Sequence, residues 1–261
     1  MPELVYPPVI AAAKTMFRVL DLRITVEGAH HVPRSGGAVM AANHVSYLDF
    51  IFCGFGAQES GRLVRFMAKQ SVFTNRIAGP LMRGMRHIPV DRNAGAASYG
   101  AALRALRGGE VVGVFPEATI SRSFTVKELK SGSTRMAKAA RVPLLPVALW
   151  GGQRLWTKGR PRTLTRRHVP ITIIVGEPMN PADYPDANVM NADLTERLSA
   201  LVDRAQREYP DTPAGPDDAW WQPAHLGGSA PTLEEAALLE ARGQRVPAAD
   251  PAADPAADPA G

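Results

Sequence analysis

The feature that most constrains the fold is a run of five apolar residues, Val111-Val112-Gly113-Val114-Phe115, which stops at Pro116. A continuous apolar run is typical of a strand buried on both faces. Similar runs lie at 38–42, 88–90 and 142–150, with helix-like segments between them. Strands that alternate with helices predict an α/β domain over residues 22–210, with a layered sheet flanked by helices.

Proline places one of these strands. Pro143 and Pro146 lack the backbone N–H that a strand shares with its neighbours. We therefore expect the strand at 142–150 to lie at an edge of the sheet or to be irregular.

Two shorter segments flank the domain. Residues 1–21 contain an amphipathic stretch after Pro7-Pro8, which predicts a helix that either lies in a membrane interface or packs on the body as a lid. The basic body favours the interface. Residues 211–261 are rich in Pro, Ala and Asp, which predicts a largely disordered tail without a catalytic role. Within this tail, one helix is expected at 232–242, and Trp220-Trp221 is expected to dock on the body or on a membrane.

Charge is distributed unevenly along the chain. Of the 30 Lys and Arg, 28 lie in residues 1–210 with 16 Asp and Glu (net +12), whereas residues 211–261 hold 2 against 9 (net −7). A basic body predicts an anionic partner, such as a membrane surface, nucleic acid or a phosphorylated substrate. The single cysteine, Cys53, excludes an internal disulfide and a cysteine-based metal cluster.

The sequence also bears on localisation. No apolar run approaches the roughly 18 residues that a membrane-spanning helix needs, and the N-terminus lacks a secretory pattern. We therefore expect a cytoplasmic protein that associates peripherally with the inner face of the cell membrane.

A histidine and an acid follow the apolar run at 38–42. His44 falls in the loop after this run, and Asp49 lies at the start of the next apolar helix. A loop that folds the imidazole over the carboxylate creates a general base held in one tautomer. The alternative is a capping box, in which Ser46 and Asp49 cap the helix and His44 is an ordinary loop residue.

Two further apolar runs are each followed by a charged residue that can bind a ligand or act as an acid or base. Arg92 follows the run at 88–90, and Glu117 follows the run at 111–115. Ligands bind at the carboxyl ends of strands in open α/β sheets. The sequence therefore predicts that His44, Arg92 and Glu117 share one site.

Four blocks occur in order along the chain: Asn43-His44-x4-Asp49, Ile88-Pro89-Val90-Asp91-Arg92, Phe115-Pro116-Glu117 and Val142-Pro143-Leu144-Leu145-Pro146-Val147-Ala148. Together, over about residues 24–180, they resemble the motif blocks of the glycerolipid acyltransferases, that is, the 1-acylglycerol-3-phosphate O-acyltransferases and their glycerol-3-phosphate relatives. The resemblance implies a glycerolipid-acyltransferase-like mixed sheet. It also implies transfer of a fatty acyl group from acyl-CoA or acyl carrier protein to a lysophospholipid hydroxyl, without a cofactor or metal. The expected acceptor is 1-acylglycerol-3-phosphate and the product phosphatidic acid.

The resemblance also implies residue roles. His44 is the expected general base and Asp49 its partner, while Arg92 is expected to hold the acceptor phosphate. Glu117 is expected to bind the acceptor or to order the site, and Lys130 to make a second phosphate contact. The alternatives are a surface Arg92 paired with a neighbouring acid, a helix-start role for Glu117 and an exposed, unengaged Lys130.

The third block departs from the family pattern. It usually reads Phe-Pro-Glu-Gly-Thr-Arg-Ser, but Ile120 stands where the arginine is expected. Arg122 is the nearest replacement, and Asn43 and Ser121 are further candidates for the site. The departure leaves glycerol-3-phosphate or another hydroxyl lipid open as the acceptor.

Rival functions remain to be weighed. The basic segment 158–167, next to Trp156, suits anionic lipid headgroups, the phosphates of an acyl donor, or solvent alone. A binding protein for anionic lipid or nucleic acid, without turnover, is the alternative of another class. No RNA-binding, zinc-finger or recognition-helix pattern supports nucleic acid, and the Gly-x-Ser-x-Gly elbow of serine hydrolases does not occur.

Overall fold

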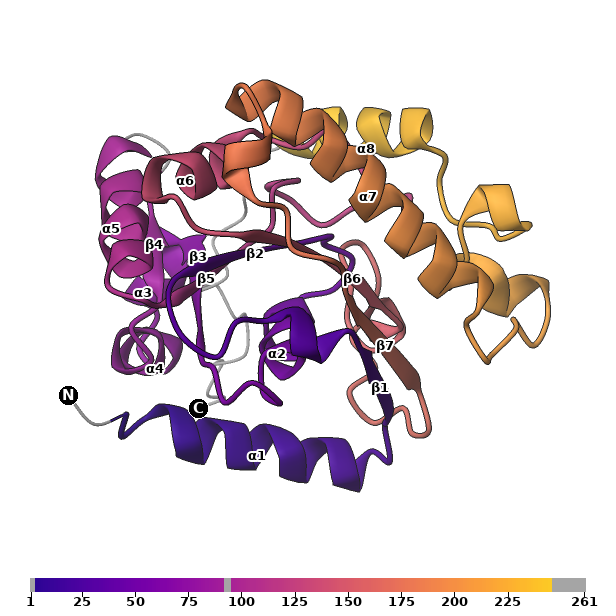
Figure 1. The fold of residues 1–261 in the computed structure, drawn as a ribbon. Coiled ribbons are helices and arrows are strands. Elements are labelled where there is room, and N and C mark those ends of the chain that lie inside the picture. Colours follow the sequence, from indigo (N-terminus) through magenta and orange to yellow (C-terminus); the bar gives the residue numbers. More distant parts are fainter. Residues whose placement is uncertain (1–2, 92–94, 246–261) are drawn as a thin grey trace.

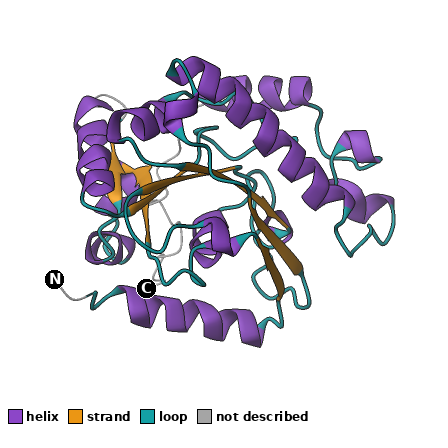
Figure 2. Ribbon diagram, viewed as in Figure 1, coloured by secondary structure: helices purple, strands orange, loops and turns teal. Residues whose placement is uncertain are grey.

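Seven strands form one sheet in the order β1-β7-β6-β2-β5-β3-β4 (Figures 1 and 2). The computed structural model describes residues 3–91 and 95–245. All neighbouring strands run parallel except β6 and β7, which are antiparallel, so the expected mixed sheet is confirmed. The strands are β1 (Arg23–Glu27), β2 (Ala38–Ala42), β3 (Val64–Lys69), β4 (Ile88–Val90), β5 (Val111–Val114), β6 (Leu144–Trp150) and β7 (Pro170–Val175).

Helices cover both faces of the sheet (Figure 1). On one face lie α5 (Gly95–Arg107), α6 (Gly132–Ala140) and α7 (Ala187–Arg207), and on the other lie α1 (Tyr6–Val19) and α2 (Asp49–Gly56). Two short helices, α3 (Gln70–Thr74) and α4 (Ala78–Gly84), connect β3 to β4.

The central strands are buried on both faces. Every residue of β2, β5 and β6 is buried. In β2, Val39 and Ala41 pack with α5, α6 and α7, whereas Met40 and Ala42 pack with α1 and α2. The continuous apolar runs of the sequence therefore form the middle layer, and Cys53 is a buried core residue of α2.

The expected edge position of the strand at 142–150 is wrong, because β6 lies between β7 and β2. Proline is tolerated there because of its register. The ladder with β7 begins only at Val147, which pairs with Val175. Pro146 lies just before it, where its carbonyl accepts a hydrogen bond from the Gly176 N–H at 2.8 Å and no ladder donor is needed.

Helix α1 packs as a lid on the body. Its Phe17 is buried and stacks on Phe52 of α2 at 5.4 Å between ring centroids. The hydroxyl of Tyr6 donates a hydrogen bond to the carbonyl of Val64 in β3. Part of the apolar face of α1 is therefore used against the protein, and its position in a membrane interface stays a prediction. No helix in the described part of the chain is long and apolar enough to cross a bilayer.

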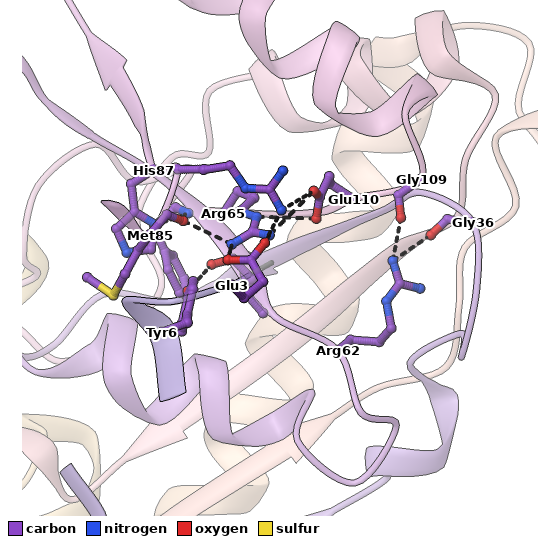
Figure 3. A network of polar contacts seen from close by, with 12 residues as sticks. Glu3, Tyr6, Gly36, Arg62, Arg65, Met85, His87, Gly109 and Glu110 are labelled. Carbon is purple, nitrogen blue, oxygen red and sulfur yellow. Dashed lines mark hydrogen bonds and ion pairs between the residues drawn. The ribbon is translucent and has the colours of Figure 1, made fainter. Parts of the chain in front are cut away.

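The residues just before α1 are tied down by a network around Arg65 of β3 (Figure 3). The Arg65 side chain is 3% exposed and forms ion pairs with Glu3 and with Glu110. It also donates to the carbonyl of Met85 at 2.9 Å, and its guanidinium lies over the ring of Tyr6 at 5.3 Å. One buried cation thus links the start of the chain to the sheet.

The segment beyond residue 210 differs from its expectation. Residues 211–245 form η4 (Pro216–Trp221), η5 (Ala224–Leu226) and α8 (Leu233–Arg245), so the helix expected at 232–242 is confirmed. Trp221 is 2% exposed, and the guanidinium of Arg154 lies over its ring at 4.5 Å. Burial of the large apolar surface of Trp221 stabilises the packing of this segment on the body. The overall composition of the segment does not reveal this contribution. The terminal repeat lies outside the described residues.

We expect Arg65→Met to lower the free energy of unfolding by about 2–4 kcal/mol, because it removes the buried partner of two carboxylates. Urea denaturation would measure the change. Arg86→Met is a matched control, since Arg86 pairs with the same Glu3 and Glu110 but its side chain is 51% exposed. The control should cost less than about 1 kcal/mol, and equal costs for the two variants would contradict a special role for burial.

Candidate active site

The loop between β2 and α2 is fixed at its start by Asn43. The Asn43 side chain is buried, donates to the carbonyl of Leu149 at 3.1 Å and accepts from the N–H of Leu149 at 2.7 Å. An amide side chain thus continues the pairing of β2 with β6 beyond the last residue of β2. The Asn43 side chain therefore fixes the start of the loop through its two hydrogen bonds with the backbone of Leu149.

His44 and Asp49 are in contact. The imidazole Nδ1 and the Asp49 Oδ2 are 2.9 Å apart. Asp49 Oδ2 also accepts hydrogen bonds from the N–H groups of Val45 and Ser46, each at 2.7 Å. The carboxylate therefore holds the loop and orients the imidazole at the same time, whereas α2 begins after Leu48 without a side-chain cap.

Burial sets the protonation properties of this pair. Asp49 is 1% exposed, and burial raises the pKa of its carboxyl, while the hydrogen bonds from His44 and from the backbone of Ser46 and Val45 oppose that rise. The three N–H donors therefore offset part of the cost of burying this carboxylate.

The imidazole of His44 is held flat against a neighbour. It stacks on the ring of Phe115 at 4.2 Å between centroids and 19° between planes, and its side chain is 20% exposed. Because Nδ1 faces Asp49, Nε2 is the nitrogen left for a substrate. Among the described residues it has no hydrogen-bond partner. An imidazole in this state can accept a proton at Nε2.

Glu117 braces the loop from the other side. Its Oε1 accepts from the backbone N–H of His44 at 2.8 Å, and its Oε2 accepts from the N–H of Lys127 at 3.3 Å. The residue is 5% exposed, and burial raises the pKa of its carboxyl to about 8. The turn that contains Glu117 places Ala118 at φ +60°. This left-handed conformation suits glycine, which is the usual residue at this position in the family pattern.

Ser121 also holds the loop between β2 and α2, here called the catalytic loop. Its N–H donates to the carbonyl of His44 at 2.7 Å, and its buried hydroxyl donates to the carbonyl of Thr125 at 2.9 Å. Ile120 beside it is 3% exposed and belongs to the interior. The serine is therefore placed to position the loop by its backbone.

The remaining predicted residues fall into three cases. Lys130 has an exposed side chain, and its backbone N–H donates to the carbonyl of Pro116 at 2.9 Å. Arg122 lies against the loop that contains Gly159. Arg92 lies outside the described residues, so its role stays a prediction.

One segment supports the site in a way that the sequence did not indicate. The carbonyl of Trp156 accepts hydrogen bonds from the Ser46 hydroxyl at 2.7 Å and from the Tyr47 N–H at 3.1 Å. The hydroxyl of Thr157 donates to the carbonyl of Val45 at 2.7 Å. These contacts join residues more than 100 positions apart, so no local pattern could have revealed them.

Within the described ranges, no group of three His, Cys, Asp or Glu is arranged to hold a metal ion.

Glu117 predicts a pH dependence of stability. Its pKa rises from 4.5 in the unfolded chain to about 8 in the folded protein, so the folded state binds the proton more tightly. This contribution to stability is complete below about pH 4.5 and is lost as the pH rises to about 8. Glu117→Gln should therefore reduce the fall in unfolding free energy between pH 5 and pH 8 by on the order of 2–4 kcal/mol.

The measurement is urea denaturation at both pH values. A constant cost of the substitution cancels in the difference between them. The exposed Glu196→Gln on α7 is the control and should leave the difference unchanged. An unaltered pH dependence in Glu117→Gln would contradict the assignment.

Comparison with known proteins gives this geometry a family. Residues 23–150 match the Acyltransferase family model. The 1-acyl-sn-glycerol-3-phosphate acyltransferase of Bacillus subtilis (strain 168) is 30% identical over 191 residues, which cover 71% of this chain and 86% of that protein. The enzyme of the same name from Limnanthes douglasii is 29% identical over 64% of this chain and 58% of its own length. The human 1-acyl-sn-glycerol-3-phosphate acyltransferase alpha is 29% identical over 63% of this chain and 59% of its own length.

A solved structure shares the fold. The crystal structure of the 1-acyl-sn-glycerophosphate (LPA) acyltransferase PlsC from Thermotoga maritima matches with a TM-score of 0.68, covering 78% of this chain and 81% of that chain at 24% identity. The family model and the Bacillus subtilis relative together define the class of the protein as an acyltransferase, and the solved structure shows the same fold. Given the extent of the match to the Bacillus subtilis enzyme, the chain belongs to the family of the 1-acyl-sn-glycerol-3-phosphate acyltransferases.

Proposed function

We propose that this protein transfers a fatty acyl group from acyl-CoA or acyl carrier protein to the free hydroxyl of 1-acylglycerol-3-phosphate, giving phosphatidic acid. The observation that carries the proposal is the His44–Asp49 pair, 2.9 Å apart at the carboxyl edge of the sheet. The relatives named above are enzymes of this reaction by name.

The proposed mechanism uses His44 as a general base. Its Nε2 takes the proton of the acceptor hydroxyl as the oxygen attacks the thioester carbonyl. The new C–O bond forms, the C–S bond breaks, and the proton passes from the imidazolium to the departing thiolate. An alcohol is too weak an acid to react unaided, whereas a thioester is already activated, so one base suffices.

In this mechanism Asp49 acts as the partner of the base. It accepts a hydrogen bond from the Nδ1–H of His44, which leaves Nε2 free to act, and it stabilises the imidazolium as the positive charge develops. The backbone donors of Val45 and Ser46 keep the same carboxylate oxygen in place. A carboxylate fixed by three donors preserves the alignment that proton transfer requires.

An apolar cavity of about 370 Å³ suits the acyl chain of a substrate. Its walls come mostly from α1, α2, β3 and α4. Phe66 of β3 lines it and stacks on Phe115 at 6.0 Å, and Phe115 in turn stacks on His44. Aromatic rings therefore connect the base to the cavity, which supports binding of the chain there with its reactive end near His44.

The part of the site expected to bind the acceptor phosphate departs from the family pattern. Ile120 is buried and cannot donate to a phosphate, although the family pattern has an arginine in its place. Arg92 and Lys130 are the proposed phosphate contacts. Glycerol-3-phosphate or another hydroxyl lipid is the second candidate acceptor, and the missing arginine is the observation that favours it.

We also propose that the protein docks on the anionic inner face of the cell membrane through α3 and α4. Residues 60–90 contain no Asp or Glu, and Lys69, Arg76 and Arg83 in this range are exposed. Ile77 is 79% exposed and Leu81 is 41% exposed, and Leu81 also lines the cavity. Apolar side chains surrounded by positive charge suit an anionic lipid surface. Nucleic acid is not a proposed partner.

His44→Ala should lower acyl transfer by roughly 10²–10⁴-fold, because it removes the base. The assay is release of CoA from a long-chain acyl-CoA with lysophosphatidate, glycerol-3-phosphate and other lyso-lipids offered separately. Lysophosphatidate should give the highest rate. His30→Ala, which changes an exposed histidine of η1 (Ala29–His31), is the control and should keep full activity. A folded His44→Ala variant with near wild-type activity would rule out the mechanism.

The double variant Arg76→Ser, Ile77→Ser should bind vesicles containing phosphatidylglycerol at least several-fold more weakly, because it removes a charge and an exposed apolar side chain from α3–α4. Co-sedimentation measures the binding. The control is Val189→Ser, Arg204→Ser on α7, where Val189 is 47% exposed. Equal losses in both variants would show that the α3–α4 surface has no special role.

A further inference from the structure

Arg122, a candidate from the sequence, meets two further basic side chains where two loops lie next to each other. Arg122 and Lys127 come from the loop after β5, and Lys158 comes from the loop after β6. The Nζ of Lys158 donates to the hydroxyl of Thr119 at 3.3 Å, which joins the two loops. All three side chains are partly buried.

Their charges act on one another. Burial lowers the pKa of Lys158; the negative charge of Glu240 opposes this, while the positive charges of Arg122 and Lys127 add to it. Cations held together in this way repel unless an anion lies among them. Repulsion among the three cations therefore raises the free energy of the unoccupied cluster, and a bound anion lowers it.

Arg122 is held beside Lys158 by a close approach to the chain. A Cβ atom added at Gly159 would come within 2.6 Å of Arg122 Nη1, so the guanidinium lies directly against the backbone next to Lys158. Its Nε is buried and donates no hydrogen bond to a described residue. Among those residues, Arg122 also forms no ion pair with an acid.

The acidic partner of the cluster comes from α8. Glu240 Oε1 lies 3.0 Å from Lys127 Nζ. Glu117 is also close, but its two oxygens accept the backbone N–H groups of His44 and Lys127, and its pKa of about 8 leaves it largely uncharged at neutral pH. The cluster therefore carries a net positive charge.

Each of the three cations is linked to the catalytic loop through a neighbouring contact. Arg122 follows Ser121, whose N–H donates to the carbonyl of His44. Lys158 follows Thr157, whose hydroxyl donates to the carbonyl of Val45. Lys127 shares Glu117 with His44 through its backbone N–H. The segments that contain the cluster are therefore the same ones that hold the backbone of His44 and Val45.

We propose that Arg122, Lys127 and Lys158 bind a phosphate monoester next to His44, and that Glu240 competes with this phosphate for Lys127. The inference rests on the proposed function, in which the acceptor head group and the 3′-phosphate of CoA are both phosphate monoesters. A guanidinium and two ammonium groups match a phosphate dianion in charge and in donors. Arg122 then supplies the donor that Ile120 lacks.

Helix α8 is held in a way that permits this competition. Ala236 is buried, whereas Leu233 and Leu238 are 52% and 56% exposed, so few of its large apolar side chains are used in packing. The side chains of Lys127 and Glu240 are 17% and 22% exposed. An ion pair within reach of water contributes modestly, and a dianion can replace the carboxylate.

The first experiment titrates the full-length protein with inorganic phosphate by calorimetry at constant ionic strength. Lys158→Ala should weaken phosphate binding at least tenfold, and Glu240→Gln should strengthen it several-fold. Lys14→Ala and Glu196→Gln, which change exposed residues of α1 and α7, are the matched controls and should leave it unchanged. This result does not depend on turnover, so it stands or fails separately from the proposed reaction.

The second experiment identifies the source of the phosphate from steady-state kinetics. A higher KM for lysophosphatidate in Lys158→Ala, with an unchanged KM for acyl-CoA, assigns the cluster to the acceptor. A higher KM for acyl-CoA, absent with a 3′-dephospho-CoA donor, assigns it to the donor. Phosphate binding that is the same in wild type, Lys158→Ala and Glu240→Gln, with unchanged thermal midpoints showing that the variants fold, would overturn the proposal.

Discussion

The rest of the site depends on one carboxylate oxygen. Asp49 Oδ2 accepts hydrogen bonds from two backbone N–H groups and from the imidazole of His44, so a single buried atom sets both the path of the loop and the direction of the ring. Burying a carboxylate is costly unless it is hydrogen-bonded, and the loop itself supplies the donors. The loop therefore needs the acid in order to fold, and the imidazole is oriented by the same interaction.

A second buried carboxylate supports the loop from the opposite side. Glu117 accepts the N–H of His44, while Ser121 donates to the carbonyl of the same residue. Both backbone groups of His44 are thus held by the segment after β5, a neighbour of β2 in the sheet. Glu117 and Ser121, which the sequence named as candidates for the site, both hold the backbone of His44. A site residue can act on the reaction without facing the substrate.

The apolar and charged side chains are also divided between different parts of the fold. The apolar face of α1 lines the cavity, and the residues just before α1 are anchored through Arg65. Exposed apolar and basic side chains gather instead on α3 and α4. The acidic segment beyond residue 210 folds back through Trp221 and brings Glu240 to Lys127. The opposite charges of body and tail therefore meet close to the site.

The sequence by itself determined the layered α/β fold, the buried central strands and the His44–Asp49 pair, because burial on both faces and a short loop leave local patterns that can be read directly. It could not determine that β6 is central despite Pro146, since that depends on where the ladder with β7 begins. Nor could it bring Thr157 to Val45 or Glu240 to Lys127, contacts between residues more than 100 positions apart. Only the tertiary structure decided these, because long-range contacts depend on how the elements pack and not on the spacing of residues along the chain.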